Sequence, residues 1–337
     1  MTSGSGGLSG ERILVTGGSG FIGTNLVEML ARRGDLVRNF DLAPPRNPEH
    51  VDRWFEGDLM DARSVRRVVT EFEPTIVQHM AARTDLRGRR LADYATNTRG
   101  VENLIEAVTN SRSVRRVVFA SSRMVCRIGY APLHEEDYCP PTVYGESKVV
   151  SEQIVRAANL PMGWIIVRPT SIWGPWFDVP YRDFFLSIAR NRYVHVGQRR
   201  VLKSFGFVGN TVHQLDRIAT ASREAIHART IYLADYPPIE VHDWAESIRG
   251  ELGSRRIRTV PYGVLRVVAK VGDLAAWLGW NGVPLTTFRL DNLLTEMVHD
   301  LDPLEKIVGP LPFSLIEGVE RTVAWLSAAG EVRISRV

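Results

Sequence analysis

The sequence predicts an α/β fold, a doubly wound parallel sheet with a smaller C-terminal α/β lobe, and three observations support this. An apolar run at 12–16 leads into a glycine-rich turn and then a helical pattern, which is the order of a nucleotide-binding βα unit. Apolar runs of strand length then alternate with helical patterns, which indicates parallel strands joined by crossover helices. The 337 residues also exceed what one core usually covers.

The strict alternation fades in the second half, so we divide the chain. We expect a flexible N-terminus at 1–10, a nucleotide-binding domain at 11–175 to which some later segments return, and a mainly substrate-binding lobe at 176–337. Later helical patterns predict helices at 181–191, 211–227 and 241–252, and a short apolar run predicts a strand at 230–234.

Two features of the lobe allow more than one interpretation. Aromatic residues gather between Trp173 and Phe185, where they would either stack on a substrate ring or pack the core of the lobe. The stretch from Val264 to Leu278 places apolar residues on one helical face. We expect that face to pack on the lobe, with a role at a membrane surface or on a partner as the alternative.

Composition describes an ordinary globular protein. Hydrophobic residues make up 44% and charged residues 24% of the chain, and the net charge is +4, without the dense basic block typical of nucleic-acid binding. The two cysteines are too few for a disulfide framework, and their spacing suits no common metal motif. Since the sequence shows neither a signal peptide nor an uncharged apolar run of membrane-spanning length, we expect a cytoplasmic protein without a metal.

The glycine-rich turn predicts a site for the phosphates of a dinucleotide. Gly17, Gly20 and Gly23 permit a tight turn, close approach of the backbone to a pyrophosphate, and close packing of helix on strand. The following helix offers free N–H groups and a partial positive charge to the phosphates. Asp41 ends the second strand, and its carboxylate would bind the adenosine ribose hydroxyls and repel a 2′-phosphate, which favours NAD over NADP.

A tyrosine and a lysine are the first candidates for catalysis. Tyr144 and Lys148 are four residues apart at the start of a helical pattern, so their side chains share one helix face. A phenol titrates near pH ~10, and an adjacent cation favours its charged form. Ser121-Ser122 follow a predicted strand, as does His79, and ligands lie off such strand ends. We expect His79 itself to be a packing residue.

With these residues in view, the sequence resembles the extended short-chain dehydrogenase/reductases of the NAD-dependent sugar epimerase/dehydratase group, and UDP-glucose 4-epimerases in particular. The resemblance implies a Rossmann-type domain that binds NAD. Weaker similarity continues to about residue 326. The motifs run in family order: Thr16-Gly-Gly-Ser-Gly-Phe-Ile-Gly23, Gly57-Asp58-Leu59, His79-Met-Ala-Ala82, Thr96-Asn97-Thr98-Arg99-Gly100, Ser121-Ser122, Tyr144-x-x-x-Lys148 and Arg168-Pro169-Thr170.

The resemblance also implies roles. Tyr144 would donate or accept the proton, Ser122 would supply the catalytic hydroxyl, and Lys148 would hold the nicotinamide ribose and lower the tyrosine's pKa. Asn97 would support the strand that bears the serine. Family members are commonly homodimers. Further contacts to the cofactor, beside Tyr144 and Lys148, would come from Gly17, Gly20, Phe21, Ile22, Gly23, Asp41, Asp58, Leu59, Ala81, Ala82, Asn97 and Thr170.

Several positions depart from the sugar-epimerase pattern. Arg123-Met124 replaces the acidic pair of the 4,6-dehydratases, which disfavours water elimination. Ser171 and Lys203 stand where the family carries an Asn and an Arg that contact substrate phosphates, and with Ser122 we expect them to bind substrate. A lysine meets a phosphate as a point charge and lacks the bidentate fork of arginine, so these changes bear on the choice of substrate.

The sequence therefore leaves three functions to be distinguished. The first is an NAD-dependent epimerase of a nucleotide-diphosphate sugar, acting at C4 through a transient keto-sugar with hydride transfer to and from bound NAD. The second is a net NAD(P)-dependent reductase or dehydrogenase of a sugar or a steroid-like alcohol that uses the same residues. The third is a dinucleotide-sensing protein without turnover.

Overall fold

The computed structural model describes residues 11–280 and 285–334. The expected flexible N-terminus at 1–10 lies outside these residues. The described chain divides into two compact units, and each of them combines three segments. The first unit takes the chain up to Ile172, then 206–234 and 300–312, and the second takes 173–205, 235–299 and 313–337. The first switch between units thus falls after residue 172, close to the expected boundary at 175.

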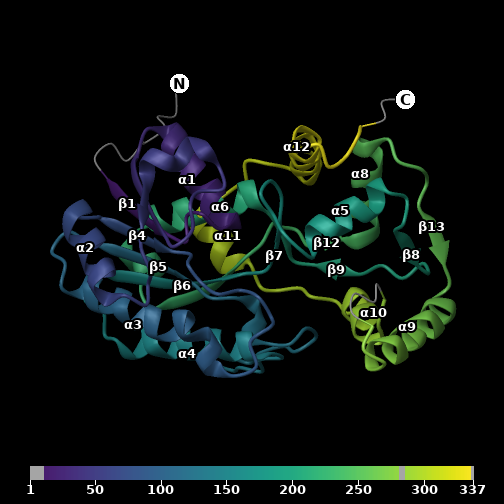
Figure 1. The fold of residues 1–337 in the computed structure, drawn as a ribbon, viewed down its shortest axis with the longest axis horizontal. Helices are drawn as coiled ribbons and strands as arrows, with labels where there is room; N and C mark the ends of the chain where they lie inside the picture. The colour runs from purple at the N-terminus through teal and green to yellow at the C-terminus, as the bar shows by residue number, and fades with distance from the viewer. Residues whose placement is uncertain (1–10, 281–284, 335–337) are drawn as a thin grey trace. The chain divides into compact units, whose positions relative to one another are not determined.

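The first unit is built on a parallel seven-stranded sheet, so the predicted α/β class is confirmed (Figure 1). Its strand order is β11-β6-β5-β4-β1-β2-β3. The strands are β1 (Arg12–Thr16), β2 (Leu36–Asp41), β3 (Trp54–Glu56), β4 (Ile76–His79), β5 (Arg116–Ala120), β6 (Gly163–Pro169) and β11 (Arg229–Leu233).

Helices cover both faces of this sheet, as a parallel sheet requires. Helices α2, α3 and α4 lie side by side on one face, and α1, α6 and α11 lie together on the other (Figure 1). The unit's helices are α1 (Phe21–Arg33), α2 (Ala62–Phe72), α3 (Ala95–Thr109), α4 (Val143–Ala157), α6 (Val208–Thr220), α7 (Arg223–Ile226) and α11 (Asp302–Val308), with short 3-10 turns η1 (Pro48–Arg53), η2 (Leu91–Tyr94) and η3 (Arg123–Val125).

One layer of the core of this unit lies between the sheet and α2, α3 and α4. Strand residues such as Leu14, Val77 and Val117 are fully buried and pack against Leu104 of α3. The apolar runs that predict these strands are continuous rather than alternating because both faces of the sheet are covered. The carboxyl ends of the central strands meet at one edge of the sheet, where all the parallel strands end together.

One predicted helix, 211–227, is wrong as a single element. Helix α6 ends at Thr220, and Ala221 turns to extended backbone with ψ 162°. The side chain of Ser222 then accepts a hydrogen bond from the amide of Ala225 and begins α7. Serine is a preferred residue at the N-terminal cap of a helix. The spacing of apolar residues alone does not tell whether such a serine lies inside one long helix or begins a new one.

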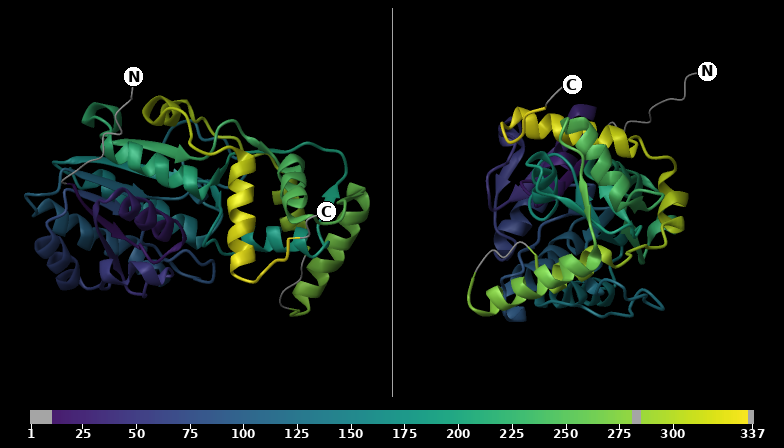
Figure 2. Two further views of the ribbon diagram at one scale, coloured as in Figure 1. Left: turned by 90° about the horizontal axis from the view of Figure 1, so that it is seen from above. Right: turned by 90° about the vertical axis from the view of Figure 1, so that its right-hand side faces the viewer.

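The second unit contains short strands and the remaining helices. Its aromatic stretch forms a core: Trp173 and Phe185 are fully buried, and Trp244 stacks on Phe184 with ring centroids 4.7 Å apart. Helix α12 packs along α8 (Figure 2). The elements are α5 (Tyr181–Ala189), β8 (Val194–Val196), β9 (Leu202–Lys203), β12 (Ile239–Glu240), α8 (Val241–Leu252), β13 (Arg258–Val260), α9 (Tyr262–Trp277), α10 (Thr287–Leu294) and α12 (Leu315–Ala328), while β7 (Ser171–Trp173) and β10 (Phe205–Phe207) lie at the unit boundaries.

The expectation that the apolar face of 264–278 packs on the lobe is wrong. Helix α9 forms where predicted, but Val267 and Val271 on that face are 64% and 62% exposed. A different side of the helix packs inward, through the small residues Ala269 and Gly272. The spacing of apolar residues predicted correctly which side of the helix is apolar. It gives no information on whether another element packs against that side.

Candidate active site

The glycine-rich loop after β1 is shaped so that only glycine fits at key points. Gly17 has a φ of 73°, and a Cβ there would lie 2.6 Å from the Cα of Ala81. A Cβ on Gly23 would lie 2.7 Å from the Cα of Gly18. Helix α1 then begins at Phe21; its N-cap residue, Gly20, offers no side-chain cap, and its first turn holds no acidic residue. The loop and the helix start therefore leave the main-chain cradle and partial positive charge that a pyrophosphate requires.

Asp41 lies beside this loop at the end of β2. Its carboxylate accepts hydrogen bonds from the amides of Ser19, at 3.0 Å, and Ala43. This is where the ribose of a dinucleotide bound over the loop would lie, so the placement of Asp41 fits NAD. Asp58 follows β3 and accepts a hydrogen bond from the amide of Met60, whereas the Leu59 side chain belongs to the core.

The segment after β4 forms the other wall of the loop. Ala81 contacts the loop closely: its amide lies 3.4 Å from the hydroxyl of Thr16, and both Ala81 and Ala82 are half-buried. The Nδ1 atom of His79 lies 2.7 Å from the Thr16 hydroxyl. Burial, with the nearby Lys148 charge, lowers the pKa of His79 to about 3, so its ring is neutral and serves as a packing group at neutral pH.

Helix α4 presents the tyrosine and the lysine. Thr142 caps the helix by accepting a hydrogen bond from the amide of Gly145. Tyr144 is 7% exposed; burial raises the pKa of its phenol, and a hydrogen bond with the side chain of Ser122 lowers it in part. The structure therefore brings Ser122, which follows β5, together with Tyr144 as the sequence predicts.

Lys148 lies one turn further along α4 and is almost completely buried. Its ammonium donates a hydrogen bond of 2.6 Å to the main-chain carbonyl of Ala120, at the end of β5. Burial lowers the pKa of Lys148 to about 8. The lysine is thus bound to the strand that leads to Ser122. Burial disfavours its charged form, and pKa values shifted in this way are common at active sites.

A buried ion pair anchors α4 one turn beyond Lys148. Arg168 of β6 binds Glu152 of α4 through two hydrogen bonds of 2.7 and 2.9 Å, and both side chains are about 2% exposed or less. Glu152 also accepts hydrogen bonds from the hydroxyls of Ser121 and Tyr138. Removing one partner of such a pair would leave an uncompensated buried charge. The network therefore fixes α4 against the ends of β5 and β6.

Asn97 braces a different pair of elements from the one expected. Its amide nitrogen donates to the hydroxyl of Ser147 on α4 and to the carbonyl of Arg83, and its amide oxygen accepts from the amide of Arg83. It therefore joins α4 to the loop after β4, and not to the strand that bears Ser122. The expectation that Asn97 supports the strand bearing Ser122 is therefore wrong.

Of the three residues expected to bind substrate, Ser122 and Ser171 lie in the first unit and Lys203 lies in the second. Ser171, buried at the start of β7, follows Thr170, whose hydroxyl donates to the carbonyl of Leu233 at the end of β11. Lys203 lies in the second unit, 4% exposed, and its ammonium donates to the main-chain carbonyls of Asn292 and Thr295 at 2.7 and 2.9 Å. Its role in phosphate binding stays a prediction.

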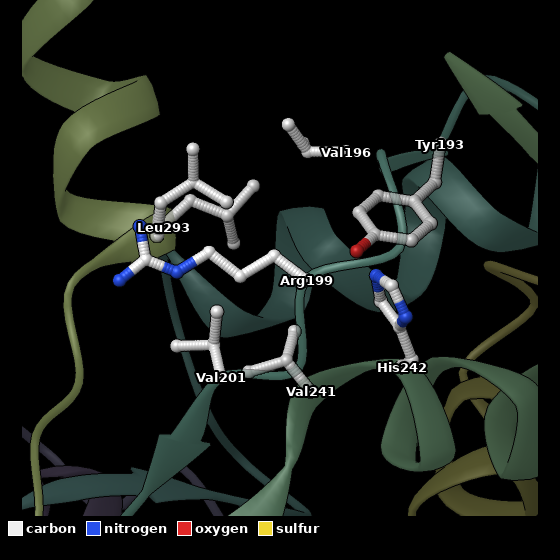
Figure 3. Close-up of a pocket in the computed structure, with 8 residues that line it drawn as sticks. Tyr193, Val196, Arg199, Val201, Val241, His242 and Leu293 are labelled. Carbon is white, nitrogen blue, oxygen red and sulfur yellow. The ribbon is translucent and has the colours of Figure 1, made fainter. Parts of the chain in front are cut away.

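The second unit contains a small, partly open pocket of its own. Figure 3 shows the side chain of Arg199 extending toward Leu293, and the Tyr193 hydroxyl pointing toward His242. A drug-sized ligand usually needs roughly 300–1,000 Å³, whereas this pocket has room for about one water molecule, so it is too small to hold such a ligand. The lining is mainly aliphatic and comprises Tyr193, Val196, Arg199, Val201, Val241, His242, Leu293 and Leu294.

Sequence reasoning missed Glu152 as a positioning residue. Two signals point to it: Glu152 follows Lys148 by one helical turn on the same face, and Arg168 is a strand residue that needs a partner if it is buried. Within the described part of the chain, no group of three or more His, Cys, Asp or Glu side chains is placed to hold a metal ion. None of the described helices combines the length and hydropathy that crossing a bilayer requires.

Two known proteins of related sequence are a dehydrogenase and a reductase. A 3 beta-hydroxysteroid dehydrogenase/Delta 5-->4-isomerase of Mycobacterium tuberculosis is 31% identical over 262 residues, which cover 72% of this chain and 70% of that protein. A 2-alkyl-3-oxoalkanoate reductase of Stenotrophomonas maltophilia is 27% identical and covers 93% of this chain and 98% of its own.

Solved structures agree on the fold. The UDP-glucose 4-epimerase of Thermotoga maritima, solved with UDP-glucose, superposes with a TM-score of 0.72 at 19% identity and covers 95% of this chain and all of its own. Residues 13–234 match the NAD dependent epimerase/dehydratase family. This match takes in the glycine loop, Asp41, Ser122 and the Tyr144–Lys148 pair, and the chain belongs to the NAD dependent epimerase/dehydratase family.

Proposed function

We propose that this protein is an NAD-dependent dehydrogenase/reductase that interconverts a secondary alcohol and a ketone on a largely apolar substrate of the hydroxysteroid or long-chain hydroxy acid type. The observation that carries the choice of chemistry is that Ser122, Tyr144 and Lys148 come together at the end of β5 and the start of α4. NAD, the family's cofactor, supplies the site that accepts or returns a hydride.

The chain's own residues would handle the proton. The reacting oxygen of the substrate would take the place between the Ser122 hydroxyl and the Tyr144 phenol, which already contact each other. During oxidation Tyr144 would accept the hydroxyl proton, and during reduction it would donate a proton to the carbonyl oxygen. The charged form of Lys148, one turn away, favours the phenolate. Glu152 and Arg168 would hold α4 so that this geometry persists.

The environment of Lys203 favours an apolar substrate over a nucleotide sugar. Its ammonium is engaged by two main-chain carbonyls, where a nucleotide-sugar enzyme would need a cation directed at a diphosphate. The 31% identical relative carries a steroid dehydrogenase name, and the reductase that covers 93% of the chain is named for alkyl substrates. These observations agree on the substrate class.

A nucleotide-sugar C4-epimerase is the second candidate, favoured by the same three catalytic residues and by the fold shared with a UDP-glucose 4-epimerase. A dinucleotide sensor without turnover has less support because the serine, the tyrosine and the lysine are all present. The homodimer and the cytoplasmic location stay predictions from the resemblance and the sequence.

Steady-state assays with the purified protein separate the candidates. We expect NADH to form when NAD is mixed with 3β-hydroxysteroids or 3-hydroxy fatty acids, and UDP-glucose to remain unconverted to UDP-galactose. Interconversion of the two UDP-sugars without net NADH, with NAD retained through purification, would instead establish the epimerase. Turnover on neither panel, together with NAD binding by calorimetry, would leave the sensor.

A further inference from the structure

Helix α9 exposes a continuous row of large apolar side chains. Val267 and Val271 are more than 60% exposed, and Trp277 is 80% exposed. Isolated exposed apolar residues are ordinary on a protein surface, but a contiguous row marks a contact site. The full row, spaced three and four residues apart, is Val264, Val267, Val268, Val271, Leu274 and Leu278, with Trp277 and Trp280 at its C-terminal end.

The outward direction of this row is fixed by what packs on the other side of the helix. Ala269 is fully buried against Val196 of β8 and Leu290 of α10, with Leu265 packed alongside. The carboxylate of Asp273 binds both the amide and the hydroxyl of Thr287, at the start of α10. Helix α9 therefore has an anchored inner side, and the apolar row cannot rotate inward without breaking these contacts.

The exposed charged side chains of α9 itself are basic. Arg266 and Lys270 lie on α9 beside the apolar residues, and both are exposed. Asp273 is the one acidic residue of α9, and it is used by Thr287. An apolar face edged by basic side chains, with tryptophans at one end, is the pattern of helices that lie in the headgroup region of anionic membranes.

We propose that α9 docks this protein on the surface of an anionic lipid bilayer, with the apolar row in the acyl boundary and Arg266 and Lys270 on lipid phosphates. A second copy of the chain is a poorer occupant, because a twofold contact of α9 on α9 would bring the basic side chains of both copies together. The proposal does not rest on the proposed function, although an apolar substrate would be drawn from the same bilayer.

Vesicle flotation of the full chain tests the proposal. We expect the wild-type protein to float with vesicles of equal parts phosphatidylcholine and phosphatidylglycerol, and to do so less at high salt. Val267→Glu/Val271→Glu should lower the partition coefficient on the order of 100-fold, because both apolar burial and charge attraction are reversed. Arg266→Gln/Lys270→Gln should lower it about 25-fold, since each basic residue near an anionic surface contributes about fivefold.

The matched control is Val51→Glu/Ile316→Glu, which changes two side chains of similar exposure, 56% and 62%, outside α9. It should float like the wild type, and circular dichroism should show all variants folded. The proposal is overturned if the wild type stays with the protein-only fraction, or if the α9 variant floats as well as the control. It is also overturned if light scattering shows a dimer that the α9 variant breaks while no form binds vesicles.

Discussion

Helices α4 and α9 have nearly the same length, 15 and 16 residues, but they break the usual burial rule in opposite directions. Helix α4 buries Lys148 and Glu152, and each finds a specific partner. Helix α9 leaves valines, leucines and a tryptophan exposed. Because a buried polar group or an exposed apolar row is costly in a protein without a use for it, we read α4 as the catalytic element and α9 as a docking element. If this is right, substitutions in and around α4 should affect catalysis and stability more than a substitution in the second unit.

The largest effect is expected from Tyr144→Phe. The variant keeps the packing of the ring, which lies 6.0 Å from the ring of Tyr94 between centroids, and it removes the proton-transferring hydroxyl. We expect kcat/KM to fall by about 10³-fold, in the range typical of general acid–base catalysis. Thermal unfolding should change little. Wild-type turnover in pure, folded Tyr144→Phe protein would refute the catalytic assignment.

Breaking the anchor of α4 should lower stability more than any single change on the surface. Arg168→Leu leaves Glu152 charged and buried, which should cost about 3–5 kcal/mol in the free energy of unfolding. The double variant Arg168→Leu/Glu152→Leu should recover much of this loss because no charge is left unpaired. Urea titrations of the three proteins measure the difference. Equal stability of wild type and Arg168→Leu would contradict a structural role for the pair.

Lys148→Met should reduce activity and increase stability at the same time. The ordinary pKa of the lysine, 10.5, falls to about 8 on burial, so below pH 8 the folded protein holds a charge in an apolar site. Removing it should raise the free energy of unfolding by about 1–3 kcal/mol at neutral pH.

The free energy of unfolding should also depend on pH through Lys148. Between about pH 8 and 10.5 the unfolded chain still binds the Lys148 proton while the folded chain has released it. The wild type should therefore gain stability with rising pH in this window, and the advantage of Lys148→Met should shrink across it. Denaturation curves at neutral pH and above pH 10 check this, and a pH-independent difference would argue against a depressed lysine pKa.

The smallest effect on catalysis is expected from Lys203→Met in the second unit. The change leaves the carbonyls of Asn292 and Thr295 without this donor, which should cost about 1–2 kcal/mol of stability. The KM for an apolar alcohol should stay within about twofold, because in the proposed mechanism Lys203 does not contact the substrate. A large rise in KM for a UDP-sugar would instead show that the lysine contacts a diphosphate.

The residues whose position in the fold can be predicted from sequence are those whose position depends on the backbone alone. Gly17, Asp41 and Ser122 lie at strand ends, and a parallel sheet brings strand ends together whatever the side chains do. Tyr144 and Lys148 share a helix face for an equally local reason. The pairing of Glu152 with Arg168 depends on how α4 rests on β6, which local pattern does not encode. The sequence likewise predicts that α9 has an apolar face. Only the tertiary structure shows that no other element of the described chain packs on this face.

The interleaving of the two units has a consequence for how the chain is made. The chain passes between units after residues 172, 205, 234, 299 and 312, so any stop before residue 312 leaves both units without a segment. During synthesis the seven-stranded sheet cannot receive β11 until residue 233 has emerged, nor α11 until residue 308. Contacts between residues this distant in sequence slow folding, and until they form, apolar surface and strand edges stay exposed. Neither unit is therefore a fragment that a simple truncation would express alone.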